Sequence, residues 1–74
     1  SPREVDEVIL DHPAVEQVVT FAMPHPKLGE DVAAAVVLKA GATVTERELQ
    51  QFVGQRLADM KVPRKVLFLA EIPK

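Results

Sequence analysis

Residues 32–38 read Val-Ala-Ala-Ala-Val-Val-Leu, a run whose seven residues are all apolar, so that both faces of a strand would be apolar. The β-branched valines near both ends favour a strand, because such side chains fit a pleated sheet better than a helix. Alanine is the best helix former, but a short run that is apolar on both faces is typical of a buried strand. We therefore predict a strand at 32–38, and expect it to be the central one, covered on both faces.

The segment before this run, residues 15–23, alternates between two sides and predicts a second strand. One side is strongly apolar, and the pattern assigns to it Val15, Val19, Phe21 and Met23. The other side is mixed, with Glu16, Val18, Thr20 and Ala22. We expect the loop at 24–30 to join the two strands as an antiparallel hairpin.

A helix is predicted over residues 2–11, before these strands. Its start, Ser1-Pro2-Arg3-Glu4, combines a capping serine, a proline at the first helical position and a glutamate that can reach back. Its apolar stripe is Val5, Val8 and Ile9, whereas Arg3, Asp6 and Glu7 are expected to face water. Pro13 ends it, because the residue before a proline avoids the helical region.

A second helix is predicted after the turn at residues 41–44. Thr45-Glu46-Arg47-Glu48 is a capping box, and the buried stripe that follows is Leu49, Phe52, Val53 and Leu57. Gly54 lies inside this predicted helix, where glycine costs about 1 kcal/mol relative to alanine, which suggests that another segment packs closely there. Pro63 prevents the helix from continuing, and a last strand is predicted at 66–70.

The resulting order is α-β-β-α-β. We predict an α+β fold, a small two-layer domain in which two helices pack on a three-stranded mixed sheet. The last strand is expected to lie parallel to the central one after a right-handed crossover. With 74 residues and no linker, the chain at 1–74 is expected to be a single domain.

Composition excludes several classes of protein. The net charge of −2 and the aromatic content of 4% argue against a nucleic-acid-binding protein, which needs excess basic charge and stacking platforms. No apolar run approaches the roughly 20 residues that span a bilayer, so no membrane span is expected. The absence of cysteine excludes disulfides and thiolate metal sites.

Few residues carry chemistry. His12 and His25 each precede a proline, lack a partner at metal-ligand spacing, and are interpreted as turn residues, so no metal site is expected. No serine or threonine lies in a nucleophile elbow. The carboxylates of Glu30 and Asp31 follow Gly29, which allows a sharp turn. They either close a hairpin loop or face another part of a larger protein.

Positive charge flanks the last predicted strand, on Lys61, Arg64, Lys65 and Lys74. These residues form either a solvated basic rim or part of a site for the phosphates of a nucleotide-bearing ligand, since lysine and arginine donate charge-assisted hydrogen bonds to phosphate oxygens.

Three ordered segments carry a family resemblance over nearly the whole chain. They are residues 1–8, the stretch Pro24-His25-Pro26-Lys27-Leu28-Gly29-Glu30-Asp31, and residues 57–65 followed by Glu71-Ile72-Pro73-Lys74. In this order and spacing, the chain resembles the C-terminal domain of the AMP-forming acyl-CoA synthetases of the adenylate-forming ligase superfamily, of the fatty-acid or aryl-CoA ligase type.

The resemblance implies a fragment of an ATP-dependent acid–CoA ligase, which converts a carboxylic acid, ATP and CoA to acyl-CoA, AMP and diphosphate. The chain would be the core of a mobile lid over the active site, with a large N-terminal ATP-binding domain as partner and CoA and acyl-adenylate at the interface. The parent enzyme would use ATP, Mg and CoA in the cytoplasm. The isolated chain is expected to bind no cofactor alone and to be inactive.

The family's catalytic lysine lies in a Gly-Lys segment that would follow Lys74, and its hinge would precede Ser1, so no catalytic residue is expected within the chain. The candidates for the CoA channel or the domain interface are Leu28, Gly29, Glu30, Met60, Lys61 and Pro63. Some relatives carry aromatic or basic side chains at the positions of Leu28, Met60 and Val62, so an adenine contact from these residues is not expected.

A different interpretation is a self-standing protein-interaction module without enzyme activity, which composition and pattern also permit. In either case, two helices on three strands just cover one core, so an apolar patch, marginal stability or self-association is expected.

Overall fold

The computed structural model describes residues 2–27 and 29–73. Its sheet has the order β1-β2-β3, formed by β1 (Val15–His25), β2 (Gly29–Leu38) and β3 (Lys65–Phe68). β2 pairs antiparallel with β1 and parallel with β3, so the predicted mixed sheet with a central second strand is confirmed.

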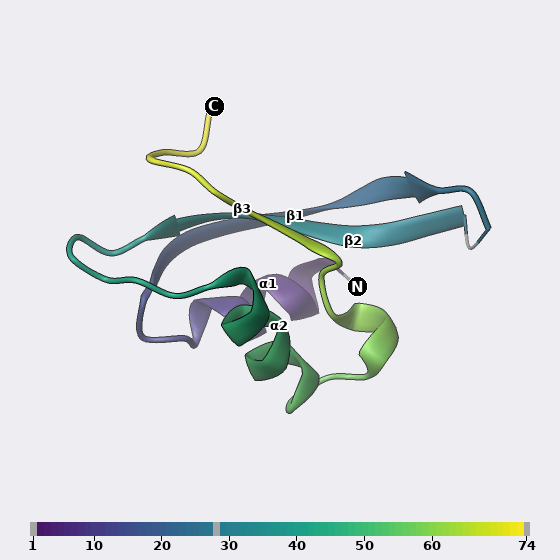
Figure 1. Ribbon diagram of the computed structural model, residues 1–74, viewed down its shortest axis with the longest axis horizontal. Helices are drawn as coiled ribbons and strands as arrows, with labels where there is room; N and C mark the ends of the chain where they lie inside the picture. Colours follow the sequence, from purple (N-terminus) through teal and green to yellow (C-terminus); the bar gives the residue numbers. More distant parts are fainter. Residues whose placement is uncertain (1, 28, 74) are drawn as a thin grey trace.

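Two helices, α1 (Pro2–Leu10) and α2 (Glu46–Gly54), lie on the same face of this sheet (Figure 1). The predicted α-β-β-α-β order and the two-layer α+β fold are therefore confirmed. A short 3-10 helix that the pattern did not indicate, η1 (Asp59–Lys61), lies between α2 and β3.

The core lies between the helices and the sheet. Its members are small or medium aliphatic side chains from α1, β1, β2, α2 and β3: Val5, Ile9, Val15, Ala34, Val36, Leu49, Val53 and Val66. The predicted stripes of both helices supply the largest of these side chains, which is why amphipathic spacing located the core. Leu57, predicted on the second stripe, packs against the core from beyond the end of α2.

The hairpin is longer than predicted. β1 continues to His25 and β2 begins at Gly29, with His25 opposite Gly29, so the loop predicted at 24–30 is mostly strand. Pro24 is tolerated because β1 is an edge strand. No strand lies on its outer side, so the missing N–H of proline breaks no hydrogen bond there. The last strand is shorter than predicted, since β3 ends at Phe68 and not at residue 70.

The grouping of Val15 with Val19 and Phe21 on one side of β1 was wrong. A register shift between Val15 and Gln17 adds a residue to β1, so Val15 is buried in the core while Val19 and Phe21 lie on the opposite face of the sheet. A bulge of this kind moves every later side chain to the other face, which strict alternation cannot anticipate. The helices therefore cover the mixed side of β1.

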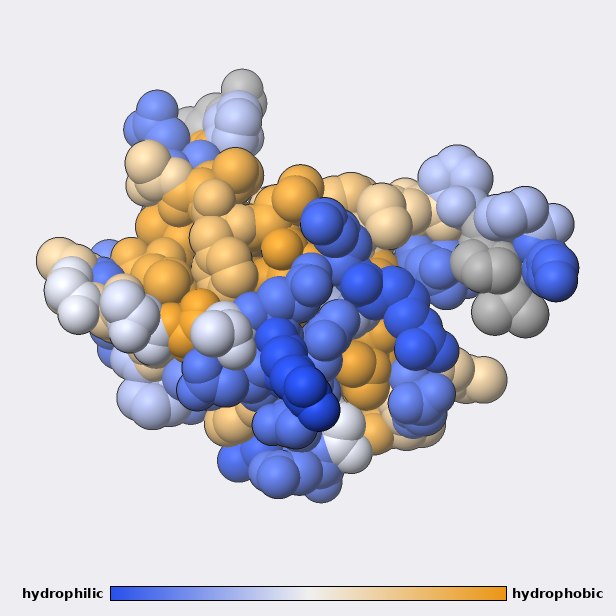
Figure 2. Space-filling model, in the orientation of Figure 1, coloured by the Kyte–Doolittle hydropathy of each residue, from blue (hydrophilic) through white to orange (hydrophobic). Residues whose placement is uncertain are grey.

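The sheet face away from the helices remains apolar. It carries Val19 and Phe21 of β1, which are 43% and 39% exposed, and Leu67 of β3, which is 42% exposed. In Figure 2, hydrophobic surface gathers over β3 and the segment that follows it. The predicted apolar patch is present on this face, which we call the open sheet face.

One helix residue predicted to face water does not. Asp6 turns towards the free edge of β1, where its Oδ1 accepts a hydrogen bond from the backbone N–H of Thr20 at 3.0 Å. Arg3 and Glu7 are exposed as predicted and form an ion pair at 3.4 Å. The capping box of α2 is confirmed, with Thr45 Oγ1 accepting from Glu48 N at 3.1 Å and Glu48 Oε1 from Thr45 N at 3.2 Å. The corresponding cap predicted at Ser1 lies outside the described residues.

Candidate functional site

The turn of the hairpin supplies the first group of predicted site residues. Leu28 lies outside the described residues. Gly29 has φ = 87°, a conformation that side chains of L-residues rarely adopt, although the space around it is open. Glu30 is exposed and lies opposite Pro24 in the hairpin. Gly29 is therefore needed for the backbone turn that begins β2.

The segment around η1 supplies the second group. Met60 is 79% exposed, the highest exposure among the large hydrophobic side chains described. Pro63 is fully buried, so it anchors the segment. Backbone hydrogen bonds from Lys61 N to Ala58 O (2.9 Å) and from Val62 N to Asp59 O (3.1 Å) fix the turn that displays Met60.

Lys61 is tied to the start of α1. Its Nζ lies 2.5 Å from Glu4 Oε1, and both side chains remain partly exposed. The hydrogen bond from Lys61 and the attraction of its charge lower the pKa of Glu4 from its ordinary value of 4.5. This ion pair joins two segments that are 57 residues apart in the sequence.

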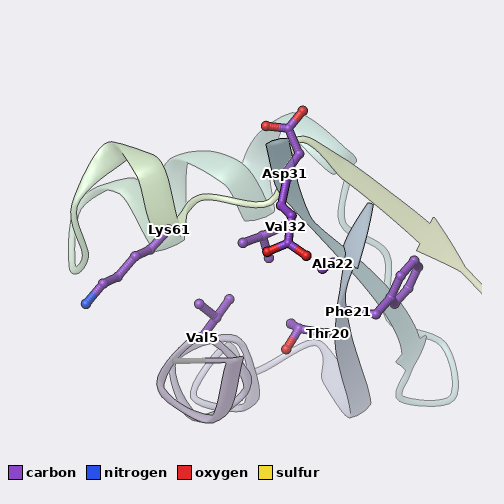
Figure 3. Close-up of a pocket in the computed structure, with 8 residues that line it drawn as sticks. Val5, Thr20, Phe21, Ala22, Asp31, Val32 and Lys61 are labelled. Atoms are coloured by element: carbon purple, nitrogen blue, oxygen red, sulfur yellow. The ribbon is translucent and has the colours of Figure 1, made fainter. Parts of the chain in front are cut away.

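The structure brings Glu30 and Lys61 to one cleft of about 270 Å³ between α1, η1 and the hairpin. The cleft is mostly apolar, lined by Val5, Thr20, Phe21, Ala22, Glu30, Asp31, Val32 and Lys61. In Figure 3, Val5 and Val32 lie on opposite sides of the hollow, and the Lys61 side chain extends away from Asp31. The two predicted segments therefore border the same hollow.

A second groove, of about 320 Å³, lies on the other side of η1 between α2 and the segment leading to β3. It is lined by Arg47, Gln50, Gln51, Gly54, Asp59, Val62, Pro63 and Arg64. Gln50 joins its two walls, because its Nε2 donates to Pro63 O at 3.0 Å. Arg64 was singled out from the sequence, whereas Arg47 was not, because an arginine at the start of a helix carries no distinguishing signal.

The two histidines lie in different kinds of structure. His12 lies in the turn after α1 as predicted, where its Nδ1 accepts from Ala14 N at 3.1 Å and its ring meets the Phe52 ring edge-on, with centroids 4.9 Å apart. Arg56 covers the same ring, 3.6 Å from its centroid. His25 is the last residue of β1, so its assignment to a turn is wrong.

This arrangement can bind and position a ligand through exposed apolar and cationic groups. Among residues 2–27 and 29–73, no three histidine, aspartate or glutamate side chains gather as metal ligands would. Neither helix in this part of the chain has the length and hydropathy that a bilayer crossing requires.

Known proteins resemble this chain in sequence and fold. Residues 4–74 match the family described as the AMP-binding enzyme C-terminal domain. An oxalate–CoA ligase of Arabidopsis thaliana is 45% identical over 74 residues, which are 100% of this chain and 14% of that protein. A long-chain-fatty-acid–CoA ligase of Bacillus subtilis is 44% identical over 99% of this chain and 13% of that protein.

Solved structures of several ligases resemble the chain in fold as well. The ATP-bound MatB of Rhodopseudomonas palustris superposes with a TM-score of 0.93 at 34% identity, over 99% of this chain and 14% of that one. A Mycobacterium tuberculosis fatty acyl CoA synthetase gives a TM-score of 0.88 at 38% identity, over 99% and 14% of the two chains. The chain thus spans about 14% of the length of the curated relatives it matches. Because the match extends from residue 4 to residue 74, the chain belongs to the AMP-binding enzyme C-terminal domain family.

Proposed function

We propose that the protein containing this chain activates a carboxylic acid with ATP and transfers the acyl group to CoA, releasing AMP and diphosphate. Membership of the family supports this proposal, as do relatives that are named CoA ligases. Residues 1–74 form one domain of that enzyme, work against a large N-terminal ATP-binding domain in the cytoplasm, and catalyse nothing alone. ATP, CoA and Mg²⁺ are needed by the whole enzyme, and we place no Mg²⁺ ligand in this chain.

Within that enzyme, this domain is a lid whose η1 surface borders the CoA channel. The observation that carries this proposal is Met60, which is 79% exposed on a turn that hydrogen bonds hold in place. A flexible thioether on a fixed turn can pack along the apolar pantetheine arm of CoA. The buried Pro63 and the Lys61–Glu4 ion pair keep that turn positioned.

The lid acts by gating. When the lid closes over the acyl-adenylate, it excludes water from this reactive mixed anhydride. The lid then reorients and presents a second surface to CoA. Glu30 at the hairpin end lies on the same cleft as Lys61, so both predicted segments can face the acyl-adenylate and CoA side of the large domain.

Acyl-adenylate formation and thioester formation can be measured separately, and only the second should depend on Met60 if this residue borders the CoA channel. In the whole enzyme, Met60→Glu should leave acyl-adenylate formation unchanged, measured as pyrophosphate exchange, and should slow thioester formation about tenfold because a charge is placed against the apolar arm of CoA. Leu10→Glu, at another exposed large apolar residue, is the matched control.

Equal thioester rates in the two variants would contradict the channel role of Met60. The acid panel should include oxalate, 2-succinylbenzoate and long-chain fatty acids, because relatives are named for these substrates.

A further inference from the structure

Glu4 and Lys61 connect two elements from opposite ends of the sequence. Glu4 lies in the first turn of α1, and Lys61 is the last residue of η1. Lys61 Nζ lies 2.5 Å from Glu4 Oε1, so the ion pair is also a charge-assisted hydrogen bond. The contact therefore ties the η1 turn, which displays Met60, to the start of the first helix.

The carboxylate of Glu4 is well placed for this contact. The positive end of the helix dipole stabilises an acidic side chain in the first turn of a helix, which favours the ionised form of Glu4. Lys61 in turn lowers the pKa of Glu4 from its ordinary value of 4.5. Both charges are therefore present at neutral pH, where the pair holds η1 against α1.

The pair also sets the direction of the Lys61 side chain. Lys61 lines the cleft between α1, η1 and the hairpin, and Glu30 and Asp31 line the same cleft. Their carboxylates would attract a lysine that Glu4 no longer held. In the structure, Lys61 extends away from Asp31 instead (Figure 3). Glu4 thus keeps the ammonium group of Lys61 away from the acidic side of the cleft.

A second ion pair on α1 provides a contrast. Arg3 and Glu7 are 3.4 Å apart on neighbouring turns of the same helix, and their side chains are 88% and 68% exposed. Such a pair supports the helix only locally. The side chains of Glu4 and Lys61 are less exposed, at 45% and 37%, and their residues are 57 positions apart. Loss of this second pair would therefore release η1 as well.

We propose that Glu4 is a positioning residue of the lid, which acts through Lys61 to hold the η1 turn on α1 in the orientation that thioester formation requires. The inference rests on the proposed function and extends it from the η1 turn to the start of the first helix. In the proposed enzyme, the large N-terminal domain precedes α1 in the sequence. A reorientation of the lid then reaches η1 through the Glu4–Lys61 pair as well as through the core.

The test measures acyl-adenylate formation, as pyrophosphate exchange, and thioester formation in the whole enzyme. Glu4→Gln should slow thioester formation about threefold, which is the size of effect that a partly exposed ion pair can supply, and should leave pyrophosphate exchange unchanged. Lys61→Gln should do the same. Glu7→Gln, which breaks the Arg3–Glu7 pair on the same helix, is the control and should alter neither step.

Reversing the two charges separates the role of the ion pair from a general loss of stability. Glu4→Lys should slow thioester formation more than Glu4→Gln, because it places two cations side by side. The double variant Glu4→Lys and Lys61→Glu should recover part of the lost rate, since it restores a pair of opposite charges. Thermal unfolding of each variant checks that the enzyme remains folded.

The outcomes distinguish this inference from the proposed function. If the wild-type enzyme forms acyl-CoA and Glu4→Gln behaves like Glu7→Gln, the role of Glu4 is wrong while the ligase proposal stands. An equal loss in both steps, or a double variant no faster than Glu4→Lys, would likewise overturn it. If the wild-type enzyme forms no acyl-CoA, the proposed function itself fails.

Discussion

The carboxylate of Glu46 accepts a hydrogen bond from the backbone N–H of Val66, with Oε2 2.7 Å from the nitrogen. Glu46 is the first residue of α2 and Val66 belongs to the edge strand β3, so the contact joins a helix start to the free edge of the sheet. Asp6 of α1 does the same at the other edge, through Thr20 N of β1. A carboxylate from each helix thus accepts a hydrogen bond from one outward N–H of an edge strand. The edges are therefore poorer templates for pairing with another chain.

We predict that Glu46→Ala lowers the free energy of unfolding by about 2 kcal/mol, because hydrogen bonds to charged groups are worth roughly 1.5–3 kcal/mol. Urea unfolding measures this difference. Glu71→Ala removes an exposed carboxylate beyond β3 and should change stability by less than about 0.5 kcal/mol. Equal losses in the two variants would show that the Glu46–Val66 contact contributes nothing.

The Glu4–Lys61 pair predicts a pH dependence. Since the pKa of Glu4 is lowered in the folded state, the pair stabilises the fold above the ordinary value of 4.5, and this contribution is lost as the pH falls through the lower folded value. Glu4→Gln should therefore be less stable than the wild type at neutral pH and equally stable in acid.

Unfolding curves from neutral to acid pH, at low and high salt, measure this difference. The gap should shrink in high salt, because both side chains are partly exposed. A gap that persists in acid would have to come from packing and not from the ion pair.

Gly54→Ala should stabilise the chain by about 0.5 kcal/mol, because alanine has fewer conformations in the unfolded chain and the added Cβ meets only Val62 at an ordinary distance. Thermal unfolding measures the gain. Gly29→Ala is the contrasting variant and should destabilise the chain, since Gly29 has φ = 87°. A loss of stability in Gly54→Ala would mean that the helix needs glycine at this position.

The open sheet face predicts self-association of the 74-residue chain. Val19, Phe21 and Leu67 are all more than a third exposed on this face, and contiguous apolar surface drives association. Sedimentation velocity should show a concentration-dependent increase in mass, reduced in the double variant Phe21→Ser and Leu67→Thr. A monomer at every concentration would contradict the prediction.

The sequence predicted the fold well because its signals are local. The capping box at Thr45 and the stripe through Leu49 and Val53 located α2, and the apolar run at 32–38 located the central strand. The face of β1 was not predictable, because one inserted residue near Glu16 reverses the side to which Val19 and Phe21 point.

The site was predicted only in part, for a physical reason. Lys61 and Glu30 were found by resemblance, and the structure places both on one cleft. Glu4 lies far from its partner Lys61 in the sequence and meets it only after folding. Such long-range pairs leave no periodic signal in a single sequence.

The central claim is that this domain serves thioester formation in a larger ligase. The most direct measurement is ATP-dependent release of AMP, together with acyl-CoA formation, across a panel of carboxylic acids, comparing the whole enzyme with a version deleted from residue 1 of this chain onward. The account predicts acyl-CoA and AMP from the whole enzyme and no thioester from the deletion. A whole enzyme that consumes no ATP with any acid, or a deletion that still forms acyl-CoA at the full rate, would contradict it.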